Sequence, residues 1–267
     1  MRRVAVAGIG YTRVGELWEK SLKDLAVESA VKALDNANLD KVDKVYVGNA
    51  YAPLLLNQMN LGLFIVDSLG WSNVPSISID GGEAAGSLAL HEAVTAVKYG
   101  LADSVLVVGA EKIFDASTPE VAKALMSGED QDYIAYTGIT WAGLHALLLR
   151  LYMMHYGVEH RDIAVLAVNA HRNAANNPNA QFHNPLTVED VLKSPILADP
   201  LRLMEYSGLA DGSASIILCS YEKALEVTDN PVEILASSVA TNRFILTERE
   251  NLLALEATEA AANTAFS

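Results

Sequence analysis

The sequence predicts an α/β fold built on a buried, mixed β-sheet. Short runs of β-branched residues, "VAVAGIG" at 4–10 and "KVYVGNA" at 44–50, end at glycine or turn residues. Between them, 21–38 places apolar residues at a helical period. "PSISID", a helix near 85–101 and "SVLVVGAE" then repeat this alternation. Strands that are apolar on both faces are typical of sheets covered by helices on both sides.

From about residue 113 the pattern changes to helices and polar connections. "TWAGLHALLLRLYMMHYG" predicts a strongly buried helix and "HRDIAVLAVNAHRNAANN" an amphipathic one. Thr187 and Asp190 predict a capping box that opens a third, short helix. Strand patterns return at "DGSASIILCS" and "PVEILASSVAT", and the last residues read as a helix.

Composition narrows the classes of function. With 51% hydrophobic and 19% charged residues, the chain reads as globular, and its formal charge of −14 argues against nucleic acid as a partner. No apolar run approaches the roughly 18 residues of a membrane span. The single cysteine, Cys219, allows no intrachain disulfide, in agreement with a cytoplasmic location, and its strand position favours a buried small hydrophobe over a nucleophile.

The strongest candidate for chemistry is Glu83, in "SIDGGEAAGSLAL" at 78–90. A strand, a glycine turn and a helix start would display one side chain beside backbone N–H groups near Gly82 and Gly86, which can stabilise an oxyanion. A carboxylate is a poor nucleophile but can serve as a base. The alternative is that Glu83 only complements the helix N-terminus, an effect of about 0.3 to 1 kcal/mol.

Histidines offer one further candidate. The six histidines have no cysteine or acidic partners at metal-ligand spacing, so no metal site is predicted. His171 stands apart because it lies in a polar, asparagine-rich segment that ends an apolar helix. Capping and loop hydrogen bonds are the alternative explanation of that segment.

Three stretches together carry a family resemblance: "GSLALHEAVTAVKYGLADSVLVVGAEK", "NNPNAQF" and "ADPLRLMEYSGLADGSASIIL". With the spacing between them, they resemble the thiolase superfamily, specifically sterol-carrier-protein-type thiolases. The resemblance implies a thiolase half-fold with a mixed five-stranded sheet at 1–112 and 209–228, and an inserted helical loop domain at 113–208. The start of a second, incomplete half would occupy 229–267.

Departures from the family pattern matter as much as the likeness. Thiolytic relatives carry C-A-S-G-S at the helix start, whereas this chain has E-A-A-G-S, so Glu83 matches the acylated cysteine. The Asn-His pair of the family maps to Ala170 and His171, and a Cys or Ser before Pro is replaced by Tyr206, Ser207 and Gly208. The H-D-x-F and G-H-P motifs of the second half do not occur in the sequence.

Two functions follow from the resemblance. The first is acyl-CoA chemistry without an acyl-cysteine, aldolase-like or as a degenerate acetyl-CoA acyltransferase, with Glu83, His171 and Tyr206 as catalytic candidates. The second is a non-catalytic acyl-CoA-binding or lipid-binding subunit of a thiolase-like complex. Coenzyme A thioester is expected as substrate, with no covalently bound cofactor, and a homodimer or a small zinc-ribbon/OB-fold protein as partner.

A polyanionic coenzyme A needs a local basic cluster in a chain this acidic. Arg150, Arg161, Arg172 and Arg202 lie in or near the predicted loop domain and are candidates for it. Ordinary surface salt bridges explain these arginines equally well.

Overall fold

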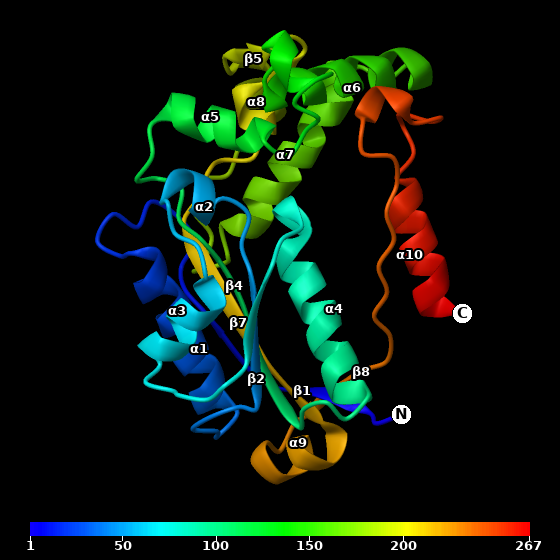
Figure 1. Cartoon of the computed structure of the whole chain (residues 1–267). Coiled ribbons are helices and arrows are strands. Elements are labelled where there is room, and N and C mark those ends of the chain that lie inside the picture. The colour runs from blue at the N-terminus through cyan, green and yellow to red at the C-terminus, as the bar shows by residue number, and fades with distance from the viewer. The chain divides into compact units, whose positions relative to one another are not determined.

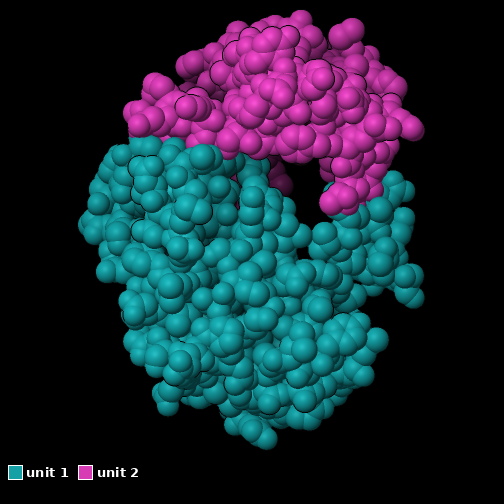
Figure 2. All heavy atoms as spheres, viewed as in Figure 1, with its two compact units in different colours: residues 1–116, 210–240, 258–267 teal, residues 117–209, 241–257 magenta.

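The computed structural model describes all 267 residues and divides the chain into two compact units. Unit 1 comprises 1–116, 210–240 and 258–267, and unit 2 comprises 117–209 and 241–257; Figure 2 colours them separately. Each unit is therefore assembled from segments that are distant in the sequence.

A mixed six-stranded sheet forms the centre of unit 1, with the strand order β3-β2-β4-β7-β1-β8. Neighbours β3, β2 and β4 run parallel, whereas β7, β1 and β8 pair antiparallel. The strands are β1 (Val4–Tyr11), β2 (Lys44–Gly48), β3 (Ser76–Ile79), β4 (Ser104–Glu111), β7 (Gly212–Ser220) and β8 (Val232–Ile234). This confirms the predicted α/β fold and its mixed sheet.

The expected number of five strands is wrong, because β8 adds a sixth. Val232–Ile234 pairs antiparallel with residues 4–6 of β1. The Arg3 guanidinium Nε also donates to Glu233 Oε1 at 2.7 Å, which ties the added strand to the start of β1. One edge of β1 pairs with β7, which leaves its other edge available for hydrogen bonding. Residues 232–234, from the segment expected to begin a second half, pair along that other edge.

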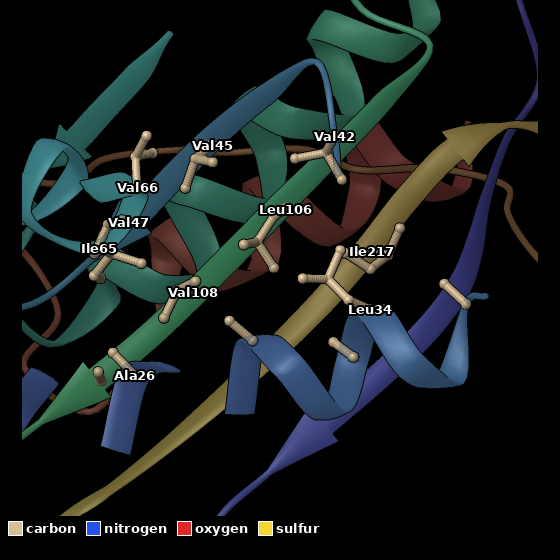
Figure 3. Close-up of a cluster of buried hydrophobic side chains, with 14 of the residues drawn as sticks. Ala26, Leu34, Val42, Val45, Val47, Ile65, Val66, Leu106, Val108 and Ile217 are labelled. Carbon is tan, nitrogen blue, oxygen red and sulfur yellow. The ribbon is translucent and has the colours of Figure 1, made fainter. Parts of the chain in front are cut away.

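Helices cover both faces of the sheet, as Figure 1 shows. On one face α1 (Leu22–Asn36) and α3 (Leu61–Ser68) pack, and on the other lies α4 (Ala85–Lys98). The alternation of β2 explains this: Val45 and Val47 enter the first cluster, drawn in Figure 3, whereas Tyr46 enters the second. A capping box of Ser21 and Asp24 starts α1. The remaining helices of this part are α2 (Ala52–Leu55) and α9 (Tyr221–Val227), and α10 (Glu256–Phe266) ends the chain.

Unit 2 is mainly helical. It contains α5 (Thr118–Met126), α6 (Trp141–Tyr156), α7 (His160–Ala174) and α8 (Val188–Lys193), and a small pair of strands, β5 (Ile196–Ala198) and β6 (Leu201–Arg202). The predicted capping box of α8 is confirmed, because the Thr187 side chain accepts from the Asp190 N–H while the Asp190 carboxylate accepts from the Thr187 N–H.

The expectation that α6 is strongly buried is wrong. Only Leu144 and Ala146 of this helix are buried, whereas Leu147 and Met154 are exposed. The local core of unit 2 around Met126, Ile134 and Leu144 contacts a single narrow side of the helix. No helix of the chain combines the length and apolar character that a membrane crossing requires.

A buried ion pair joins the strands β4 and β7 at one end. Lys112 follows β4 and Asp211 precedes β7, and the Lys112 Nζ donates to Asp211 Oδ2 at 2.6 Å. Their side chains are 1% and 0% exposed. Asp211 also accepts backbone N–H groups of Leu17, Ile113 and Phe114 at 2.7 to 3.2 Å. One carboxylate therefore fixes two backbone segments, at residue 17 and at residues 113–114.

Both partners are held in their charged forms. Burial by itself raises the pKa of Asp211, but the Lys112 hydrogen bond and the backbone N–H donors outweigh it and lower that pKa. Burial likewise opposes the charge of Lys112, yet the hydrogen bonds to Asp211 and Asp115 raise its pKa overall.

We expect Asp211→Ala to lower the free energy of unfolding by about 3 to 5 kcal/mol, because it leaves Lys112 buried without its main partner. Urea unfolding at pH 7 measures this, and Glu189→Ala, which removes an exposed ion pair with Arg161, is the control. Because the folded pKa of Asp211 is lowered, its contribution is present above the ordinary value of 3.8 and is lost as the pH falls through the folded pKa. Equal unfolding midpoints for both variants would contradict this role.

Cys219 is fully buried in β7, as its sequence position predicts. Burial raises the pKa of its thiol to about 11. We therefore expect no alkylation by iodoacetamide in the native protein at pH 8 and complete alkylation after denaturation in urea, measured by intact mass. Rapid labelling of the native protein would show that this strand opens.

Candidate functional site

The candidate site of unit 1 lies at the carboxyl ends of the parallel strands β3, β2 and β4. After β3 the chain passes through Asp80 and Gly81 into a 3₁₀ turn, Gly82–Ala84, and α4 begins at Ala85. Gly82 has φ +55°, a conformation that glycine adopts without strain. Glu83 therefore lies in this turn, just before the N-cap residue of α4, with its side chain exposed.

Two glycines shape the start of α4. A Cβ on Gly48, the last residue of β2, would lie 2.6 Å from the carbonyl carbon of Ala85, so glycine lets the helix start touch the strand end. A Cβ on Gly86 would meet no atom within 4 Å. Ala84, the N-cap residue, supplies no side-chain acceptor. The first turn of α4 is thus closely packed on β2, open beside Gly86 and without a side-chain cap.

Tyr51 contacts Glu83 directly, and sequence reasoning missed it. The Tyr51 hydroxyl donates to Glu83 Oε1 at 3.2 Å. The Tyr51 side chain comes from the segment that follows β2, and the residue is only 8% exposed. A buried ring with its hydroxyl on an exposed carboxylate links the core to the candidate base.

Glu111, the last residue of β4, holds the segment that carries Tyr51. Its Oε1 accepts from the Asn49 amide at 3.0 Å, and its Oε2 accepts from the backbone N–H groups of Ala50 at 3.0 Å and Tyr51 at 3.4 Å. Burial raises the pKa of Glu111, and these hydrogen bonds offset only part of that effect. The sequence contained a signal for this contact. Asn49 directly follows the buried strand β2 and Glu111 ends the buried strand β4, and parallel strands end at the same edge of a sheet.

His171 lies in unit 2, in the last turn of α7. Its Nδ1 is 3.1 Å from the carbonyl oxygen of Asn184. Because a carbonyl only accepts, Nδ1 carries the proton, and in the neutral ring Nε2 is then the basic nitrogen. The imidazole stacks on Phe182 with ring centroids 5.9 Å apart.

Tyr206 belongs to the same part of unit 2. It follows a 3₁₀ turn, Leu203–Glu205, and is half-buried. A Cβ on Gly208 would lie 2.9 Å from the Phe182 ring, which also stacks on His171. The structure thus brings His171 and the segment 206–208 to one aromatic ring, and separately brings Glu83 together with Gly82 and Gly86.

The four arginines each bond to a different acceptor, and Arg161 does so through an exposed ion pair with Glu189. Arg150 pairs with the Asp199 carboxylate, and Arg172 donates to the Asn169 side chain. Arg202 Nη1 donates to the Ser194 carbonyl at 2.8 Å, while its buried Nε–H has no acceptor in the structure.

One cavity that the structure contains does not include Glu83. This cavity of about 670 Å³, lined by Arg2, Asp103 and Lys223 among others, lies at the amino end of β4, whereas Glu83 follows the carboxyl end of the parallel β3. No cluster of three His, Cys, Asp or Glu side chains suited to a metal ion is present.

Comparisons with known proteins agree with this architecture. The model of the thiolase N-terminal domain matches residues 4–222. The acetyl-CoA acetyltransferase of Methanothermobacter thermautotrophicus is 38% identical over 268 residues, covering 100% of this chain and 70% of the relative. Sterol carrier protein 2 of Gallus gallus is 31% identical over 255 residues, covering 90% of this chain and 46% of the relative.

A solved structure shares the fold. An Ltp2–ChsH2(DUF35) aldolase superposes with a TM-score of 0.79 at 22% identity and covers 98% of this chain and 68% of its own. The chain belongs to the thiolase superfamily and resembles its acetyl-CoA acetyltransferases and sterol-carrier-protein-type members.

Proposed function

We propose that this chain binds coenzyme A thioesters and makes or breaks a carbon–carbon bond next to the thioester without an acyl-cysteine. The observation that carries this proposal is the exposed Glu83 carboxylate before the uncapped start of α4. In the family pattern the acylated cysteine stands at this position. The only cysteine, Cys219, is buried in β7 with a raised thiol pKa, so it is not suited to replace it.

A carboxylate favours base chemistry over acyl transfer, because its attack on a thioester would give a reactive mixed anhydride. In a retro-aldol cleavage, the base takes the hydroxyl proton of a β-hydroxyacyl-CoA. The Cα–Cβ bond then breaks, a ketone or aldehyde leaves, and the electron pair remains as the thioester enolate. Protonation of that enolate at Cα yields the shortened acyl-CoA, so no external oxidant or reductant is required.

Glu83 or Tyr206 is the candidate base in this proposal. The enolate oxygen needs hydrogen-bond donors, which the backbone N–H groups near Gly82 and Gly86 can supply. His171 would orient the substrate through Nε2, since its Nδ1 is held by a backbone carbonyl. An aldolase among the structural neighbours supports this class of reaction.

Arg150, Arg172 and Arg202 are the proposed contacts for the coenzyme A phosphates. Arg202 is the best supported, because its buried Nε–H is without an acceptor and an anionic ligand would satisfy it. Arg150 would have to share its guanidinium with Asp199, to which it is already paired.

A second candidate is a non-catalytic subunit that binds acyl-CoA or lipid. The glutamate at position 83 favours it, since the acylated cysteine of the family pattern stands there and a carboxylate cannot replace its acyl transfer. In this case the chain would bind the thioester, and turnover either would require another chain or would not occur.

We further propose that the chain forms a homodimer in the cytoplasm and can associate with a small zinc-ribbon/OB-fold protein. The name of the Ltp2–ChsH2(DUF35) aldolase joins two components, which supports a partner subunit. Sedimentation equilibrium of the purified chain should give twice the mass of 28.6 kDa. A single-chain mass at micromolar concentration would reject the homodimer.

We expect the purified protein to release ketone or aldehyde from a β-hydroxyacyl-CoA, and Glu83→Gln to lower kcat by about 10²- to 10⁴-fold, the usual contribution of a general base. Coupled detection of the carbonyl product measures the reaction. An assay of free coenzyme A, which retro-aldol cleavage neither releases nor consumes, distinguishes it from thiolysis or hydrolysis, with a β-ketoacyl-CoA tested in parallel. Glu92→Gln, at an exposed glutamate of the same helix α4, is the matched control.

Two outcomes would contradict the retro-aldol mechanism proposed for Glu83. Turnover that is unchanged in Glu83→Gln would remove the carboxylate from the mechanism. Binding of the thioester by calorimetry without turnover, with or without a partner protein, would favour the non-catalytic subunit.

A further inference from the structure

We propose that Tyr51 and Glu111 act on the proposed catalytic carboxylate: Tyr51 fixes the orientation of Glu83 through its hydroxyl, and Glu111 is a positioning residue that fixes Tyr51. This inference rests on the proposed function of Glu83 as a base. It adds two residues that sequence analysis did not single out.

Glu83 needs such a support because of its setting. Its side chain is exposed and is carried by a short 3₁₀ turn. A glutamate side chain has several rotatable bonds, and a free one samples many rotamers in water. The Tyr51 hydroxyl, 3.2 Å from Oε1, supplies a donor from a buried ring. With Oε1 engaged in this way, Oε2 is the oxygen that would take the substrate proton.

The position of Tyr51 is in turn set by hydrogen bonds of its own segment. Its backbone N–H and that of Ala50 both donate to Oε2 of Glu111. Asn49 donates to Oε1 of Glu111 at 3.0 Å and to the Ala110 carbonyl at 2.7 Å. The Asn49 Oδ1 accepts from Ala52 N at 2.8 Å, at the start of α2. A single carboxylate at the end of β4 therefore anchors residues 49–51.

Strand order makes this connection short. β2 lies between β3 and β4 and is parallel to both, so the segments that follow β3 and β2 and the last residue of β4 meet at one edge. The chain of contacts runs from Glu111 to the backbone of Tyr51, through the Tyr51 ring to its hydroxyl, and then to Glu83. All of these residues belong to unit 1.

The half-buried setting of Glu111, with three donors on its carboxylate, points to a role beyond packing. Burial raises the pKa of its carboxyl, so the charged form that the three donors require is held at a cost in stability. Groups with such perturbed pKa values occur more often at functional sites than elsewhere. A neutral glutamine cannot replace it fully, because one oxygen that accepts hydrogen bonds becomes an NH₂ donor.

A double-mutant cycle tests the proposal with the retro-aldol assay. We expect Tyr51→Phe and Glu111→Gln each to lower kcat about tenfold with little change in KM, and the double variant to be no worse than the more impaired single variant. Tyr51→Phe should have no further effect in the Glu83→Gln background. Tyr46→Phe, which removes a phenol from the buried strand β2, is the matched control. Multiplying effects in either double variant would overturn the proposal.

Two measurements work without turnover, so a failure of the proposed function is distinguishable. Native-state hydrogen exchange should be faster at the Ala50 and Tyr51 amides in Glu111→Gln, with unchanged exchange in β7. A crystal structure of Tyr51→Phe should show the Glu83 carboxylate in a different or a second rotamer. Unchanged exchange at these amides, or a single unaltered Glu83 rotamer, would overturn the positioning network even if the enzyme proves active.

Discussion

The buried Lys112–Asp211 ion pair is the interaction on which the geometry of unit 1 depends. Asp211 precedes β7, Lys112 follows β4, and the same carboxylate binds the backbone N–H of Leu17. An ion pair with both side chains almost fully buried is tolerated only when further hydrogen bonds satisfy it, and here three backbone N–H groups do so. It therefore fixes where β4 ends, and the neighbouring residue, Glu111, is the one that anchors the segment carrying Tyr51.

The candidate site lies next to that end of β4. The parallel strands β3, β2 and β4 place their carboxyl ends at one edge, and α4 starts there, packed on Gly48. A buried residue, Tyr51, and a half-buried one, Glu111, lie behind the exposed Glu83. This arrangement suits a base that must meet substrate while its orientation is set from within the protein. Cys219, buried within β7, takes no part in it.

Unit 2 contributes a second group of candidate residues with a different physical character. His171 is oriented by a backbone carbonyl and by the Phe182 ring, against which the segment after Tyr206 also packs. These contacts define the protonated nitrogen of the imidazole without any charged partner. They hold the imidazole in one orientation although the residue before it, Ala170, has no polar side chain.

The sequence by itself determined the alternation of strands and helices, the capping box at Thr187 and the buried position of Cys219, because periodicity and capping are local properties. It also pointed to Glu83 as the exposed residue between a strand and a helix. Tertiary structure alone decided the sixth strand, the exposed side of α6, and the contacts of Tyr51 with Glu83 and with Glu111. Each of these depends on which segments become neighbours in space, and residues 51, 83 and 111 are too far apart in the chain for any local pattern to reveal their contact.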